Sequence, residues 1–177
     1  MDRIKDEFKE LNIMPLSNCG VVVSLVNDNN YRLWKATMQG PKDTPYKGGL
    51  FFLNIKFPEE YPLKAPIVYF VTPIYHLNIN PWAGSSDEPL GYVNFSTLKN
   101  WRPETKMREV LVNIFALLYK PNPFDCYNFE RAQEFVNNKN AYDEKVKFFT
   151  QKYAHPMYSN KIYYKLVNKN IILYYIL

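Results

Sequence analysis

The chain has 177 residues, a formal net charge of +5 and a pI of about 9.0. Hydrophobic residues make up 47% and charged residues 22%, as is typical of a soluble globular domain with a real core. Lys and Arg are scattered, which argues against nucleic-acid binding but leaves room for an acidic protein partner. Two cysteines exclude a disulfide framework and a cysteine-based metal cluster, and no metal or cofactor is predicted.

The two ends of the chain bear on its location. The charged start MDRIKDEFKEL is not typical of a signal or transit peptide, and no apolar run reaches the ~20 residues that a membrane-spanning helix needs. A reduced compartment is expected, the cytoplasm first and the nucleus second. We expect a domain over residues 1–154 and a tail over 155–177 that packs or frays, with an interfacial membrane segment as the alternative.

The first half of the chain predicts one helix and four strands. Ile4, Phe8 and Leu11 have helical spacing, which predicts a helix over residues 2–12. Runs rich in β-branched and aromatic residues then alternate with turn-rich loops, a pattern typical of an antiparallel meander. The predicted strands cover residues 20–26, 31–38, 50–57 and 67–72.

The second half predicts an irregular segment and three helices. Residues 73–106 contain four prolines and no clean period, and long irregular segments in compact domains are often functional. Apolar residues from Met107 to Leu118 then predict a core helix, and two amphipathic helices follow, over 128–138 and around Tyr142–Tyr153. Five aromatic residues are predicted to lie in the core: Trp34, Tyr46, Phe51, Phe57 and Tyr61.

Four motifs resemble the ubiquitin-conjugating enzyme family. They are the long segment from WKATMQG to APIVYF (34–70), IYHLNIN (74–80), NWRP (100–103) and PNPFD (121–125), and the resemblance covers roughly residues 2–154. Several long motifs in order are far more specific than one short motif. The resemblance implies an α+β fold with an N-terminal helix, a four-stranded antiparallel meander, a core helix and two C-terminal helices.

The family's nucleophile is where this chain departs from the pattern. The family places a cysteine in Gly-x-Ile/Val-Cys shortly before Trp-x-Pro, and the same frame here reads Gly91-Tyr92-Val93-Asn94. A thiolate attacks and leaves readily, so it can carry a modifier as a thioester, whereas a carboxamide has no ionisable nucleophile near neutral pH. Asn94 therefore favours a protein that has lost or redirected this chemistry.

Three other family positions are retained. Asn78 matches an asparagine thought to stabilise the oxyanion, with pinning of its loop as the alternative role. His76 is expected to fix the same loop. Asp125 matches an acidic residue that helps deprotonate the incoming lysine, with a helix N-cap as the alternative.

Two departures lie around that site. Leu77 replaces the motif proline, and the polar insert PWAGSSDEPL (81–90) occupies a place where the family has only a couple of residues. The insert either covers the groove or is a tolerated surface loop.

Other residues of the chain are candidates for a substitute nucleophile. Cys126 directly follows Asp125 and is expected to lie near the groove, whereas Cys19 is expected to lie away from it. A free cysteine is more often a small buried hydrophobe than a carrier. Ser96 and Thr97 would each need an activating base, which the sequence does not place.

Partner positions also match the family. The resemblance implies that Lys5 and Lys9 dock an activating enzyme, while Leu63 and Pro103 join the first helix in binding a ligase. A solvated face is the alternative for the two lysines. Trp101 is expected to support the loop that bears Pro103. The expected partners are ubiquitin or a ubiquitin-like modifier, an activating enzyme or ligase, and a catalytic conjugating enzyme.

Three functional hypotheses follow from the sequence. The first is a non-catalytic family member that binds modifier, conjugating enzyme or ligase without carrying the thioester. The second is a working conjugating enzyme whose cysteine has been replaced by Asn94 in this sequence. The third is a structural adaptor that uses the fold with no modifier involved.

Overall fold

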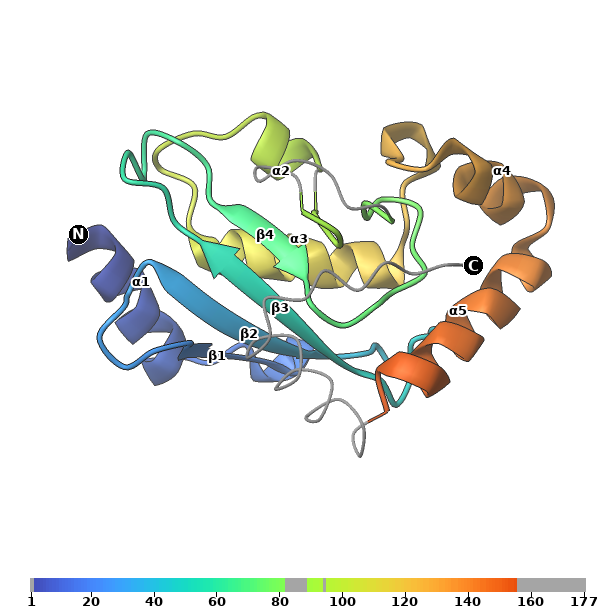
Figure 1. The fold of residues 1–177 in the computed structure, drawn as a ribbon, viewed down its shortest axis with the longest axis horizontal. Coiled ribbons are helices and arrows are strands. Elements are labelled where there is room, and N and C mark those ends of the chain that lie inside the picture. The colour runs from blue at the N-terminus through green and yellow to red at the C-terminus, as the bar shows by residue number, and fades with distance from the viewer. Residues whose placement is uncertain (1, 82–88, 94, 156–177) are drawn as a thin grey trace.

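The structure is a computed structural model that describes residues 2–81, 89–93 and 95–155 (Figure 1). A helix is followed by four strands and then by helices, and two short 3-10 helices lie between them. The elements in chain order are α1 (Asp2–Ile13), η1 (Ser17–Cys19), β1 (Val21–Leu25), β2 (Leu33–Gln39), β3 (Leu50–Lys56), β4 (Ile67–Phe70), α2 (Ser96–Lys99), α3 (Met107–Tyr119), η2 (Pro123–Asp125), α4 (Phe129–Asn137) and α5 (Lys139–Tyr153). The predicted α+β order of elements is confirmed.

The strands form one antiparallel sheet in the order β1-β2-β3-β4, as the meander prediction requires. Because side chains alternate along a strand, one face of β2 and β3 carries residues such as Trp34, Phe51 and Leu53, all of them fully buried. The apolar side of α3 belongs to the same core, and Figure 1 shows α3 lying behind the sheet. The five aromatic residues predicted to lie in the core are all buried.

Several element boundaries differ from the prediction. Strand β2 begins at Leu33 rather than at residue 31, because the Asn30 side chain accepts a hydrogen bond from the Arg32 backbone (2.9 Å) and holds a turn there. Within the segment predicted to be irregular, residues 96–99 form the short helix α2. Isolated bridges also join Tyr69 to Tyr92 and Ile79 to Val93, so part of this segment extends the sheet.

None of the helices in the described ranges combines the length and the apolar character that crossing a bilayer requires. Helix α5 ends at Tyr153, and the buried Ala154 follows it. The predicted tail lies outside the described residues from position 156 onward, and so do residues 82–88 of the polar insert.

Candidate functional site

A short extended segment, Gly91–Val93, leads up to position 94. Gly91 has φ +79°, and its backbone carbonyl accepts a hydrogen bond from Phe70 N (2.8 Å) at the end of β4. Val93 is fully buried, and its backbone N–H donates to Val68 O (2.9 Å). The residues before position 94 are therefore held against the edge of the sheet. Asn94 itself lies outside the described residues.

Asn78 lies in the neighbouring loop, with its side chain fully buried. Its Nδ2 donates to the backbone carbonyls of Asn122 and Asp125, at 2.7 Å each, while its Oδ1 accepts from Asn122 N (3.0 Å). Both ends of the amide thus bind the segment around η2, which crosses beside this loop. In this arrangement both amide hydrogens are already engaged by carbonyl oxygens, so neither is free to meet an oxyanion.

His76 fixes the same loop from the other side. Its Nδ1 accepts from Asn78 N (3.0 Å), so its Nε2 carries the proton and donates to Leu117 O (3.0 Å) in α3. The ring is fully buried, and this burial lowers the pKa of His76 from 6.5 to about 4. The neutral imidazole, with both ring nitrogens hydrogen-bonded, links the loop to α3.

The burial of His76 predicts a pH-dependent stability. The unfolded chain binds a proton near pH 6.5, whereas the folded chain does not until about pH 4, so stability is lost as the pH falls through this window. Burial of His76 contributes at most about 3 kcal/mol to the pH dependence of stability, because lowering a pKa by one pH unit corresponds to ~1.4 kcal/mol. Urea unfolding of the wild type and of His76→Gln, from pH 7 to 4, measures it as the difference between the two curves.

The chain offers a matched control for that titration. It contains only one other histidine, and His155 is exposed. We expect His155→Gln to change the free energy of unfolding at pH 7 by no more than about 0.5 kcal/mol, as surface substitutions usually do. If the free energy of unfolding varied with pH in the same way in the wild type and in His76→Gln, this role of the buried His76 imidazole would be contradicted.

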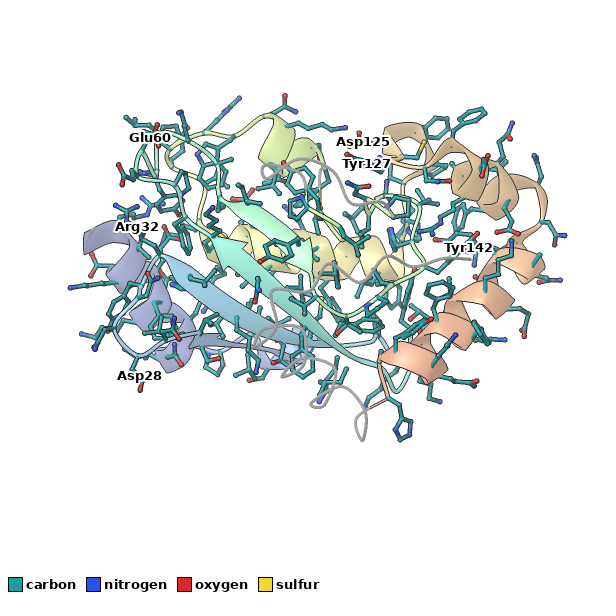
Figure 2. All side chains as sticks on the ribbon, in the orientation of Figure 1. Asp28, Arg32, Glu60, Asp125, Tyr127 and Tyr142 are labelled. Carbon is teal, nitrogen blue, oxygen red and sulfur yellow. The ribbon has the colours of Figure 1, made fainter. Side chains whose placement is uncertain are left out.

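Asp125 lies at the end of η2 and forms an ion pair with Lys99 of α2. Figure 2 labels Asp125 and Tyr127, which lie just before α4. The alternative role predicted for Asp125, a cap on the following helix, is wrong. Asn128 caps α4 itself, because its side chain lies next to the helix start and accepts from Arg131 N (2.8 Å).

The candidates for a substitute nucleophile differ in their surroundings. Cys126 is half-buried and packs against the core, and Cys19 is half-buried in η1, with its thiol pKa raised by burial. Ser96 begins α2 and is exposed. The Thr97 hydroxyl accepts a hydrogen bond from Asn113 (2.9 Å).

The partner positions predicted from the sequence lie on the surface. Lys5 and Lys9 are exposed on α1, with the Lys5 ammonium 5.3 Å from the centre of the Tyr31 ring. Leu63 is 75% exposed, and Pro103 is exposed in the loop before α3. Trp101 is half-buried and donates from Nε1 to Pro62 O (2.7 Å), which ties the two loops together.

Glu7, which no sequence motif singles out, connects the elements that carry these partner positions. It is only 4% exposed, and its carboxylate accepts from Tyr61 Oη (2.7 Å) and from Met107 N (2.6 Å), and pairs with Arg3. One carboxylate thus links α1, the loop after β3 and the start of α3. The only signal in the sequence is the Arg3–Glu7 spacing of four, which is common on surface helices.

This arrangement defines a class of protein. An N-terminal helix, a four-stranded meander, an extended segment beside the loop of Asn78 and a core helix behind the sheet together make the ubiquitin-conjugating fold. The comparisons with known proteins agree with it. The family model described as "Ubiquitin-conjugating enzyme" matches residues 3–150. The chain belongs to the ubiquitin-conjugating enzyme family and to the ubiquitin conjugation pathway.

Individual relatives give the same result. The chain is 44% identical to "Probable ubiquitin-conjugating enzyme E2 31" of Arabidopsis thaliana, over 72% of this chain and 79% of that protein. It is 38% identical to "Ubiquitin conjugating enzyme E2 B" of Dictyostelium discoideum, over 86% of this chain and 96% of that one. Among solved structures, it resembles the E2 domain of a Toxoplasma gondii ubiquitin-conjugating enzyme. That match has a TM-score of 0.72 and 30% identity, over 86% and 97% of the two chains.

Membership of the family implies interaction with ubiquitin, an activating enzyme and ligases in general.

Proposed function

We propose that this chain is a non-catalytic ubiquitin-conjugating-enzyme variant. It binds modifier, a catalytic conjugating enzyme or a ligase and positions them without carrying the thioester. The observation that carries the proposal is Asn94 in the sequence Gly91-Tyr92-Val93-Asn94, at the place where the family has its cysteine. A carboxamide cannot exchange thioesters, whatever the rest of the site provides.

The contacts of Asn78 and Asp125 support this proposal. Asn78 binds two backbone carbonyls with its amide hydrogens, and the Asp125 carboxylate is paired with Lys99. A catalytic site would need the amide for an oxyanion and the carboxylate for an incoming lysine. In this chain both groups have internal partners instead, which suits a frame that is kept for its shape.

The partner surfaces support a retained binding role. Exposed Leu63 and Pro103 lie on two loops that are joined through Trp101. Glu7 connects the first loop to α1 through Tyr61, and it also binds the start of α3, into which the second loop leads. A buried network beneath exposed apolar residues gives a pre-formed surface, and pre-organisation lowers the cost of binding. Lys5 and Lys9 add positive charge on α1 for an acidic partner.

A charging assay tests the proposal. The chain is mixed with activating enzyme, ATP and ubiquitin, and separately with ubiquitin-like modifiers, and is then run on non-reducing gels. We expect no thiol-sensitive adduct on the unmodified chain. We expect one on Asn94→Cys, since the frame then regains the atom that the chemistry needs. Asn94→Ala is the matched control, because it changes the same position without adding a nucleophile.

Two outcomes would contradict the proposal or narrow it. A thiol-sensitive adduct on the unmodified chain would contradict the proposal that the chain is non-catalytic. Loss of that adduct in Cys126→Ala would identify Cys126 as the carrier. No adduct even on Asn94→Cys, together with no binding to modifier or ligase, would favour the structural adaptor. The replaced-cysteine hypothesis is tested separately, by reading codon 94 of the gene: a cysteine codon would establish it.

A further inference from the structure

The outer face of the sheet, which points away from α3, contains an unexpected buried region. In β3 the core residues are Phe51, Leu53 and Ile55, so alternation turns Phe52 and Asn54 to the opposite face. Phe52 is nevertheless only 3% exposed and Asn54 only 9%. An antiparallel sheet covered by helices on one side normally leaves its other face to solvent.

The burial is confined to one part of this face. On β1 the outward residue Val22 is 63% exposed, and Ser24 is exposed too. Around β3, by contrast, the Lys35 ammonium lies 4.9 Å from the centre of the Phe52 ring, and burial lowers the pKa of Lys35. The covered region, which we call the β3 patch, comprises Lys35, Phe52, Asn54 and Tyr69.

The β3 patch also contains an acceptor that needs a donor. Asn54 donates from Nδ2 to the Tyr69 hydroxyl (3.1 Å), but its Oδ1 is buried and accepts no hydrogen bond from any described residue. A buried acceptor without a donor costs about 1–3 kcal/mol. The patch therefore suits an apolar segment that also brings an N–H or O–H group.

We propose that the chain's own C-terminal tail, residues 156–177, covers the β3 patch. Its starting point is close by: Ala154 O accepts a hydrogen bond from Leu50 N (2.7 Å), and Leu50 begins the strand that carries Phe52. From there a tail of about 20 residues can reach roughly 70 Å when extended, far more than the sheet requires. Because the tail is attached beside the patch, its binding is intramolecular and its effective concentration at the patch is high.

The composition of the tail matches the patch. It ends in the apolar run IILYYIL. Leaving these side chains exposed to water would cost about 25 cal/mol per Å² of apolar surface. It also carries Asn, Lys and Tyr side chains, any of which supplies a donor for Asn54 Oδ1. A partner that binds this face of the sheet would first have to displace the tail. This inference does not depend on the chemistry at position 94.

Limited proteolysis of the full chain tests the proposal. Trypsin cuts after Lys161, Lys165 and Lys169 only when the tail is released, so the cutting rate follows the released fraction. We expect Phe52→Ser to raise this rate at least roughly tenfold. Leu63→Ser is the matched control, because it removes another large apolar side chain, one that is exposed and lies in the loop after β3 instead of on the sheet.

A second variant keeps the test independent of folding. The double change Ile172→Asp and Leu173→Asp alters only the tail, so it cannot unfold the domain, and it should speed cutting as Phe52→Ser does. Equally fast cutting of the wild type and both variants would overturn the proposal. Protection that appears only at high protein concentration, together with a dimer mass, would assign the patch to a second copy instead. Protection that appears only with anionic vesicles would assign the tail to a membrane surface.

Discussion

Replacing Glu7 by Ala is expected to lower the free energy of unfolding by about 4 kcal/mol. The change removes the acceptor of Tyr61 Oη and of Met107 N, and it leaves two buried donors without a partner. It also removes a carboxylate that stabilises the N-terminus of α3. Urea unfolding at pH 7 measures the loss.

Glu10 provides the matched control for this prediction. It lies one turn further along α1 and pairs with Lys106 and Arg108, but its side chain is 27% exposed. Surface pairs of this kind contribute about 0–1 kcal/mol, so Glu10→Ala should have little effect. Glu7→Gln keeps one acceptor oxygen and should fall between the two. Equal losses in Glu7→Ala and Glu10→Ala would mean that the buried network does not hold α1 to the loops.

Replacing Gly91 by Ala is expected to cost more than about 4 kcal/mol, in the exceptional range for one substitution. Gly91 has φ +79°, which an L side chain adopts at a cost of about 1–2 kcal/mol. A Cβ would in addition lie 2.2 Å from Phe70 O, a backbone atom that cannot rotate away. The segment leading to position 94 would have to leave the sheet edge. Thermal unfolding measures the loss, and charging of Asn94→Cys should disappear with it.

Gly48 separates the two causes. It has a similar φ, +81°, but a Cβ there meets no atom within 4 Å. Gly48→Ala should therefore show only the backbone cost, about 1–2 kcal/mol. If Gly48→Ala and Gly91→Ala were equally destabilised, the close approach of Gly91 to β4 would have no part in holding the frame.

Much of this protein follows from its sequence because local physics determines it. Helical spacing in Ile4, Phe8 and Leu11 and alternation in the strands identify the elements, since apolar side chains must share one face to be buried. That Asn94 offers no ionisable nucleophile also follows from the sequence, because a carboxamide has none in any fold.

The tertiary structure decided what the polar and outward-facing residues do. Glu7 is a buried link only because Tyr61 and Met107, distant in sequence, converge on it. Asp125 pairs with Lys99 instead of capping α4, since Asn128 lies closer to the helix start. Phe52 faces outward by alternation and is still buried. Periodicity reports which face of an element a side chain occupies, whereas only the packing of distant segments determines what that face meets.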